Sequence, residues 1–266
     1  MTAVENAPAR AQIRARTLRT DRWWVQPVGT GLVLTIFLIY TVIRVWMREW
    51  YWVDQYNYLT PLYSPCVSTS CAPGSSHFGQ WFGDFPIVIP ITIITLVIVM
   101  GFRVTCYYYR KVQYRSFLFS PPGCAVQEPA KSYKGESKFP FILQNAHRYF
   151  FYIASVLALV NTYDAVHAFF PKYGGFGFGL GSLLMLAMVV SLWLYTLSCH
   201  ACRHVIGGKL KHFSKHPVRY RFWGVVSTLN HKHMQWAWTS LLLVMATDIY
   251  IMSVSAGWIS DLRIIN

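Results

Sequence analysis

Long apolar stretches dominate the hydropathy pattern of this chain. A helix needs about 20 apolar residues, at 1.5 Å each, to cross about 30 Å of hydrocarbon. Five stretches come near that length, at residues 28–46, 85–102, 149–170, 180–197 and 234–254. The pattern therefore predicts an all-α fold, an integral membrane bundle of five transmembrane helices.

The ends of the chain are polar and flank this helical region. We divide the sequence into a basic leader at 1–27, a helical membrane domain at 28–258 and a short outer tail at 259–266. No small-residue cleavage site follows the first stretch, so we expect it to remain as a helix. Arg44 lies near its far end, where a long side chain is expected to reach the membrane interface.

Charge is distributed unevenly along the chain. The composition is 54% hydrophobic and 13% charged, which argues against a plain soluble enzyme, yet the formal net charge is +14. Twenty of the 24 Lys and Arg residues lie in the leader and in the connections after the second and fourth stretches. The positive-inside rule places these parts in the cytoplasm. We therefore expect a multi-pass protein of the plasma membrane with its N-terminus inside and its C-terminus outside, and no nucleic-acid partner.

The cysteines and histidines separate by side of the membrane. Cys66 and Cys71 lie in a turn-rich loop on the predicted outer side, where thiols oxidise, so we expect a local disulfide between them. The other four cysteines and seven of the nine histidines fall on the cytoplasmic side. These eleven residues are Cys106, Cys124, Cys199, Cys202, His147, His200, His204, His212, His216, His231 and His233.

Five of these side chains share helix faces that point into the bundle. If the fourth helix continues through Arg203, Cys199 and Cys202 lie on one face with Ser191 and Tyr195. The other three continue stripes of small or weakly polar residues, which line helix interfaces in membranes. They are Cys106, His147 and His233.

This mixture of ligands allows several readings. Two Cys and two His suit tetrahedral zinc, or a Rieske-type 2Fe-2S cluster in which two His replace two Cys on one iron. Two histidines from facing helices would instead suit haem b. The residues could also be polar side chains at the membrane interface that bind nothing. His200 and His204 lie on another face of the fourth helix and remain further candidate ligands.

Several short motifs together resemble one family. The chain is similar, from about the second helix to the fifth, to the membrane-anchor subunit of the actinobacterial, mycobacterial-type succinate dehydrogenase. The motifs that carry the resemblance are Cys106-Tyr-Tyr-Tyr-Arg-Lys111, Arg115-Ser-Phe, Ser120-Pro-Pro-Gly-Cys-Ala-Val-Gln-Glu-Pro129, Tyr149-Phe-Phe-Tyr152, Tyr163-Asp-Ala-Val-His-Ala-Phe169, Cys199-His-Ala-Cys-Arg-His204, Gly207-Gly-Lys-Leu, His216-Pro-Val-Arg-Tyr220 and Leu229-Asn-His-Lys-His-Met234.

The resemblance implies a subunit of respiratory complex II that works with a flavoprotein subunit and an iron–sulfur subunit. In this branch the anchor resembles a five-helix subunit with a Rieske-type cluster in the membrane. The resemblance also allows a homotrimer of the complex. The helix faces select Cys199, Cys202, His147 and His233 as its ligands, with Cys106, His200 and His204 in reserve. Electrons would pass from the iron–sulfur subunit through the cluster to a quinone, either menaquinone or ubiquinone.

The quinone site is less well defined by the sequence. Arg103, Tyr107 and Trp236 offer a cation, a hydroxyl and a stacking ring near the predicted cluster, and the alternative for each is an interfacial anchor. Asp164 is an ionisable residue inside an apolar stretch, which marks it as a functional candidate near the outer surface, together with His167.

Two other functions remain open at this point. The Cys199 and Cys202 pair could pass electrons from dithiols to a quinone, although it lies on the reducing side of the membrane. Alternatively, the chain could be a transporter or scaffold whose histidines bind zinc. The basic loops would contact membrane lipid, a docked subunit, or both.

Overall fold

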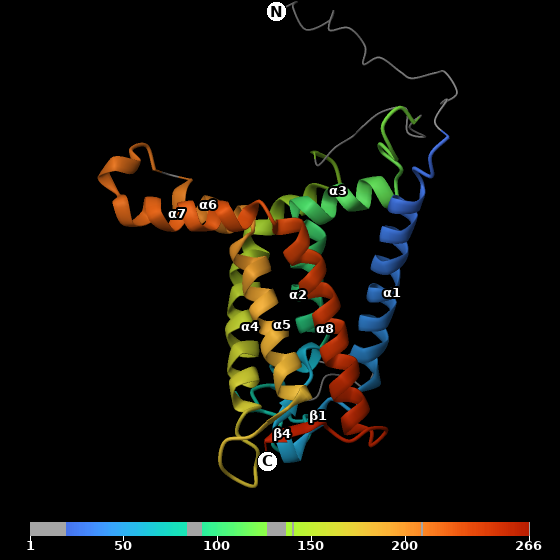
Figure 1. The fold of residues 1–266 in the computed structure, drawn as a ribbon, viewed down its shortest axis with the longest axis vertical. Helices are drawn as coiled ribbons and strands as arrows, with labels where there is room; N and C mark the ends of the chain where they lie inside the picture. The colour runs from blue at the N-terminus through green and yellow to red at the C-terminus, as the bar shows by residue number, and fades with distance from the viewer. Residues whose placement is uncertain (1–19, 84–91, 127–136, 140, 209, 266) are drawn as a thin grey trace, which may run out of the picture.

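The computed structural model describes residues 20–83, 92–126, 137–139, 141–208 and 210–265. Its long helices stand side by side in one upright bundle (Figure 1). Four helices are long and apolar enough to cross a membrane, or up to five if the bent pair α2–α3 is one span. The predicted helical membrane fold is confirmed. The long helices are α1 (Val25–Met47), α2 (Ile93–Thr105), α4 (His147–His167), α5 (Leu180–Leu197) and α8 (His233–Ser255).

The hydropathy pattern located α1, α4, α5 and α8 to within three residues at each end, whereas α2 begins at Ile93, eight residues after the predicted start of the second stretch. The fourth stretch, 180–197, has the same bounds as α5, and the fifth is one residue shorter than α8 at each end. Residues 85–91 of the second stretch and residues 1–19 of the leader lie outside the described residues. The agreement follows because the bilayer thickness sets the length of an apolar helix.

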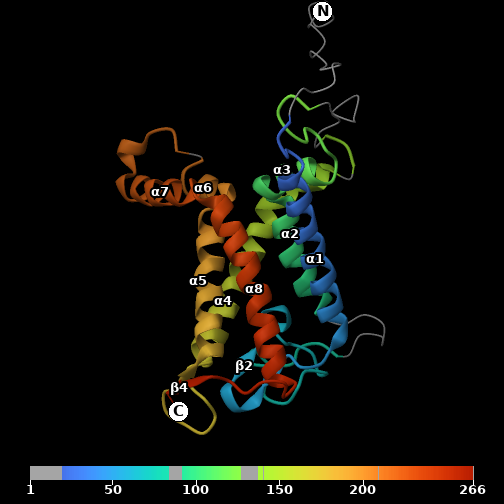
Figure 2. The same cartoon turned by 45° about the vertical axis from the view of Figure 1, so that its right-hand side comes forward.

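Three shorter helices cross one end of the bundle. They are α3 (Tyr107–Ser116), α6 (His200–Gly207) and α7 (Pro217–Asn230), with 3₁₀ turns η4 (Phe141–Ala146) and η5 (Phe213–Lys215) beside them. Figures 1 and 2 show α3 leaving the bundle on one side and α6 and α7 on the other. We call this end the basic end, because α3, α6 and α7 carry Arg110, Lys111, Arg115, Arg203, Arg219 and Arg221.

The expected continuation of the fourth helix through Arg203 is wrong. Helix α5 ends at Leu197, and Cys199 has an extended backbone with φ −66° and ψ 143° before α6 begins. The Ser198 hydroxyl donates to the Tyr195 carbonyl at 3.0 Å. In a continuous α-helix this carbonyl would accept a hydrogen bond from a backbone N–H instead. Cys199 and Cys202 therefore do not share one face of a continuous helix.

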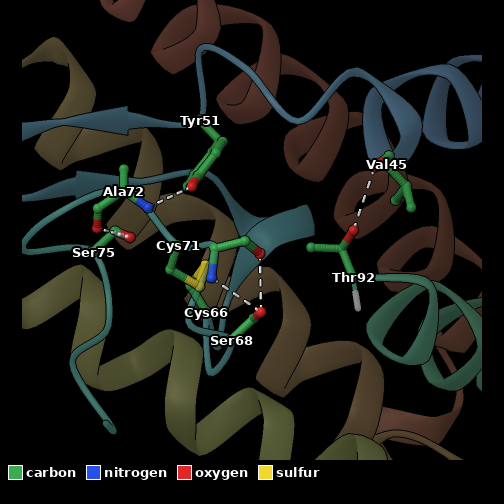
Figure 3. The surroundings of a disulfide bond; sticks show 9 residues. Val45, Tyr51, Cys66, Ser68, Cys71, Ala72, Ser75 and Thr92 are labelled. Carbon is green, nitrogen blue, oxygen red and sulfur yellow. Dashed lines mark hydrogen bonds between the residues drawn. A yellow bond between two sulfur atoms is a disulfide. The ribbon is translucent and has the colours of Figure 1, made fainter. Parts of the chain in front are cut away.

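The opposite end of the bundle is closed by a folded loop. Its elements are β1 (Trp52–Val53), η1 (Asp54–Tyr56), β2 (Tyr58–Leu59) and η2 (Pro61–Tyr63), with β1 and β2 antiparallel. A disulfide joins Cys66 to Cys71. Figure 3 shows that the loop beside this bond is fixed by hydrogen bonds, including one from the Ala72 amide to the Tyr51 hydroxyl at 2.7 Å.

The C-terminal tail also belongs to this end. Its strand β4 (Arg263–Ile265) pairs antiparallel with β3 (Phe178–Gly179), which leads into α5. Asp261 accepts hydrogen bonds from the Tyr58 hydroxyl at 2.9 Å and from the Gly181 amide at 3.1 Å. Because β3 and Gly181 precede the rest of α5, the tail fastens the start of that helix to the loop.

A buried ion pair connects the first and last long helices. Arg44 Nε lies 2.7 Å from Asp248 Oδ2, and both side chains are almost fully buried. The Tyr40 hydroxyl donates to the same carboxylate. The guanidinium also donates to the backbone carbonyls of Glu49 and Trp50, just beyond the end of α1. Protein groups therefore surround the charge of Arg44, and its place at the membrane interface stays a prediction.

Candidate metal centre

Two helix breaks at the basic end each place a cysteine inside the bundle. Cys106 lies between α2 and α3, which are bent by 77°, and its backbone is extended with φ −60° and ψ 134°. Cys199 lies in the same conformation between Ser198 and α6. Both cysteines are buried, and each directly precedes the first residue of a short helix. The two sulfurs therefore lie near helix N-termini, where backbone N–H groups favour negative charge.

The first residues of α4 and α8 supply a histidine to each cysteine. His147 Nε2 lies 2.9 Å from the Cys199 sulfur, and His233 Nε2 lies 3.3 Å from the Cys106 sulfur. The rings that stack on these two histidines, Phe102 on His147 and Tyr195 on His233, lie with their centroids 5.2 Å apart. Two Cys–His pairs from four different parts of the chain thus meet at one level of the bundle.

Hydroxyl groups fix the other nitrogen of each imidazole. Thr105 Oγ1 lies 2.9 Å from His147 Nδ1, and Ser198 Oγ lies 2.7 Å from His233 Nδ1. Each hydroxyl belongs to the residue just before a cysteine, but it contacts the histidine that faces the other cysteine. The two halves of the site are therefore interlocked, and each histidine presents Nε2 to a sulfur.

Aromatic rings cover the imidazoles in the same paired manner. Phe102 stacks on His147 with ring centroids 5.1 Å apart, and Tyr195 stacks on His233 at the same distance. Phe102 and Tyr195 each lie four residues before a cysteine. The segments 102–106 and 195–199 thus have one pattern, an aromatic residue, any residue, an aliphatic residue, a hydroxyl residue and Cys.

The surroundings keep the thiol of Cys199 protonated when nothing binds it. Burial raises the pKa of this thiol, and the neighbouring Cys106 raises it further, whereas the backbone amides of Ala201 and Cys202 lower it. A metal ligand must be a thiolate, so binding of a metal group would release this proton.

The donor set fits a group with two metal ions better than a single ion. Among the described residues, no three His, Cys, Asp or Glu side chains are arranged to hold one metal ion. The structure instead brings together two sulfurs and two imidazole nitrogens as two pairs. Two Cys and two His are the ligands of a Rieske-type cluster, with the cysteines on one iron and the histidines on the other.

The structure arranges the other predicted ligands differently. Cys202 is buried in α6, but the structure places Cys106 rather than Cys202 against His233. His200 is the first residue of α6 and is exposed. His204 is exposed and lies 2.7 Å from an Arg148 nitrogen.

The three predicted quinone contacts do not lie in one environment. Arg103 is only 5% exposed, and its guanidinium donates to the Tyr109 hydroxyl at 3.0 Å. Tyr107 is 67% exposed and stacks against Arg110. Trp236 is partly buried, and its Nε1 is buried without a hydrogen-bond partner among the described residues. Trp236 thus offers an unused donor beside the Cys–His pairs, one turn from His233 on α8.

Asp164 lies near the end of the bundle opposite to the metal centre and is buried there. It accepts a hydrogen bond from the Ser64 hydroxyl and lies 2.7 Å from His77 Nδ1. The His77 ring in turn packs against His167, with centroids 4.7 Å apart. The Asp164 carboxylate therefore binds Ser64 and His77 of the folded loop.

The sequence reasoning missed Thr105 and Ser198 as part of the site. Both are small hydroxyl residues, which are common at helix interfaces in membranes, so neither stands out alone. The available signal was the five-residue pattern shared by 102–106 and 195–199, which ends on a cysteine both times.

Comparisons with known proteins agree on one family. Residues 25–257 match the model of the family described as actinobacterial succinate dehydrogenase subunit SdhC. A chain in the solved structure of the Mycobacterium smegmatis Sdh1 complex in the apo form is 60% identical to this one, with a TM-score of 0.90, and the match covers 98% of both chains. No match was found among curated proteins.

Proposed function

Because this chain belongs to the actinobacterial succinate dehydrogenase subunit SdhC family, and is therefore a membrane subunit of complex II, we propose that it relays electrons to quinone through a Rieske-type 2Fe-2S cluster. Cys106 and Cys199 would hold one iron, and His147 and His233 the other. The observation that carries the proposal is the meeting of two Cys–His pairs at 2.9 and 3.3 Å. When bound, such a cluster accepts and passes on single electrons.

This ligand set replaces one residue of the set that the helix faces selected. Cys106 takes the place of Cys202, because the break after Leu197 turns α6 away from the axis of α5. The interlocked hydroxyls of Thr105 and Ser198 support the assignment, since outer-shell groups of this kind orient a metal-binding histidine.

The geometry favours this proposal over haem b, a single zinc ion and a thiol oxidoreductase. Haem b would need the two Nε2 atoms free to face an iron, but each contacts a sulfur. A single zinc ion would need three or four ligands around one point, which the described residues do not provide. A thiol oxidoreductase would need a paired Cys199 and Cys202, but the Cys199 sulfur lies 2.9 Å from His147 Nε2, and only Cys202 lies within α6.

We place the quinone beside Trp236. Its buried and unpartnered Nε1 could donate to a quinone carbonyl close to the Cys–His pairs. The basic end would face the cytoplasm, where the iron–sulfur and flavoprotein subunits dock and deliver electrons, and where Lys and Arg also contact lipid headgroups. Tyr107, which is exposed at this end, could contact the quinone or lipid from outside the bundle.

The decisive experiment compares two cysteine variants of the purified complex. We expect the dithionite-reduced complex to show a Rieske-type electron paramagnetic resonance signal, which C106A removes and C202A retains. If C202A removes the signal and C106A retains it, Cys199 and Cys202 are the cysteine ligands instead. A split Soret band would identify haem b, and a silent spectrum with stoichiometric zinc would support a zinc site; either would overturn the proposal.

A functional assay tests the two histidines. The double variant H147A/H233A should lose quinone reduction, while succinate oxidation with a soluble artificial acceptor continues. Unchanged quinone reduction would reject this histidine assignment. The soluble acceptor serves as the control, because it reports on the subunits that oxidise succinate without using the membrane subunit.

A further inference from the structure

A buried arginine that has no carboxylate partner among the described residues lies beside the candidate metal centre. The Arg103 guanidinium is bound by three neutral groups, the Tyr109 hydroxyl at 3.0 Å, the Ala237 carbonyl at 3.2 Å and the Ser240 hydroxyl at 3.2 Å. It also lies over the ring of Tyr195, 5.0 Å from its centroid. These contacts fix the position of the charge but do not neutralise it.

The carboxylates of the bundle are engaged elsewhere. Among the described residues, Asp248 pairs with Arg44, and Asp164 bonds Ser64 and His77. A buried charge without a counter-charge is costly, and ionisable side chains inside a membrane usually face a partner or a functional site. The structure thus leaves the positive charge of Arg103 to be balanced by something other than a carboxylate.

The cysteines of the site would bring negative charge near Arg103 once a metal group binds them as thiolates. Arg103 is three residues before Cys106, and its carbonyl accepts a hydrogen bond from the Cys106 amide at 3.1 Å. The Tyr195 ring lies between the Arg103 guanidinium, which it faces at 5.0 Å, and the imidazole of His233, which it stacks on at 5.1 Å. Arg103 is therefore held next to the site, where it contacts the ring that stacks on a candidate ligand.

We infer that Arg103 is the fixed counter-charge of this metal centre and that it raises the reduction potential of the group held by Cys106 and Cys199. The inference rests on the proposed function. Two thiolates bring two negative charges to the site, and reduction adds one electron without forming or breaking a bond. A nearby positive charge in a medium of low dielectric constant stabilises the reduced form more than the oxidised form.

The test is a redox titration of the electron paramagnetic resonance signal in the purified complex. We expect R103Q to lower the one-electron equilibrium constant for reduction about tenfold, which is about 59 mV in midpoint potential. R103K keeps the charge and should stay close to the unsubstituted complex. R219Q removes one positive charge from exposed α7, where Arg219 only donates to backbone carbonyls, and should leave the potential unchanged.

Each outcome decides the inference. A lowered potential in R103Q alone supports it, as does loss of the signal in R103Q with retention in R103K. An R103Q midpoint equal to that of the unsubstituted complex overturns the inference and leaves the proposed function intact. Loss of the signal in both R103Q and R103K assigns Arg103 a purely structural role and also overturns it. Absence of a Rieske-type signal from the unsubstituted complex overturns the proposed function and this inference together.

Discussion

The hydroxyl of Thr105 lies 2.9 Å from Nδ1 of His147, although 42 residues separate the two in sequence. His147 in turn faces Cys199, whereas Thr105 adjoins Cys106. The same relationship connects Ser198 to His233 and Cys106. Each half of the site therefore orients a ligand of the other half, so neither half is complete without its counterpart.

This interlocking predicts that the hydroxyls matter for metal binding. T105V keeps the volume of the side chain but removes the hydrogen bond to His147, so we expect the metal affinity of the site to fall about 10- to 100-fold, the usual effect of losing an outer-shell partner. T105S keeps the hydroxyl and should bind nearly as well as the unsubstituted chain. Iron content and the reduced-state resonance signal of the purified complex measure this.

The matched control for T105V is S155A. Ser155 lies on α4 like His147, but its hydroxyl donates only to the Phe151 carbonyl at 2.7 Å. Removing it should leave iron content unchanged. Full iron occupancy and an unaltered midpoint potential in T105V would show that the hydroxyl does not orient His147.

Much of the fold could be predicted because it follows from bilayer thickness. Apolar length alone gave the bounds of α5. Small or weakly polar residues were expected to face inward, and Ala158 and Asn161 on α4 and Ser240 and Thr247 on α8 are buried. The site was only partly predictable. The position of Cys202 depends on the helix break after Leu197. This break contains neither Gly nor Pro and is accompanied by local hydroxyl bonding, which is a weak signal in a sequence.

The buried pair of Arg44 and Asp248 predicts a large effect of removing one partner. R44M leaves the Asp248 carboxylate uncompensated inside the bundle, which costs roughly 3–5 kcal/mol in comparable buried pairs. Replacing both, as R44M/D248L, removes the uncompensated charge and should recover much of that loss. Thermal unfolding of the complex in detergent measures the change, and a double variant less stable than R44M would contradict this explanation.

The exposed pair of Lys172 and Asp54 should matter far less. Solvent screens this pair, because both side chains are about half exposed, so K172M should cost less than about 1 kcal/mol. The hydrogen bond from Lys172, with a second from Trp52, holds the pKa of Asp54 below its usual value. The small stabilisation is therefore complete above about pH 4, the pKa of an unfolded Asp, and is lost as pH falls through the lower folded pKa.

The comparison that checks this is the pH dependence of unfolding in two chains. Between pH 7 and pH 4, the unsubstituted chain and K172M should differ by a constant small amount, and the difference should shrink at lower pH. A difference that grows as pH falls would have the wrong sign for a depressed carboxyl pKa and would reject Lys172 as its cause.

The disulfide of Cys66 and Cys71 should stabilise the loop without affecting the metal centre. The two residues are five positions apart. Closing so short a loop lowers the entropy of the unfolded chain and thereby stabilises the folded state by about 2 kcal/mol. The bond lies in the folded loop, whereas Cys106 and Cys199 lie at the basic end (Figure 1). We therefore expect C66S/C71S to lower the unfolding temperature of the complex while its resonance signal and midpoint potential stay unchanged. A shifted potential would mean that the two ends of the bundle are coupled, because the loop also holds Ser64 and His77 against Asp164 on α4, the helix that begins with His147.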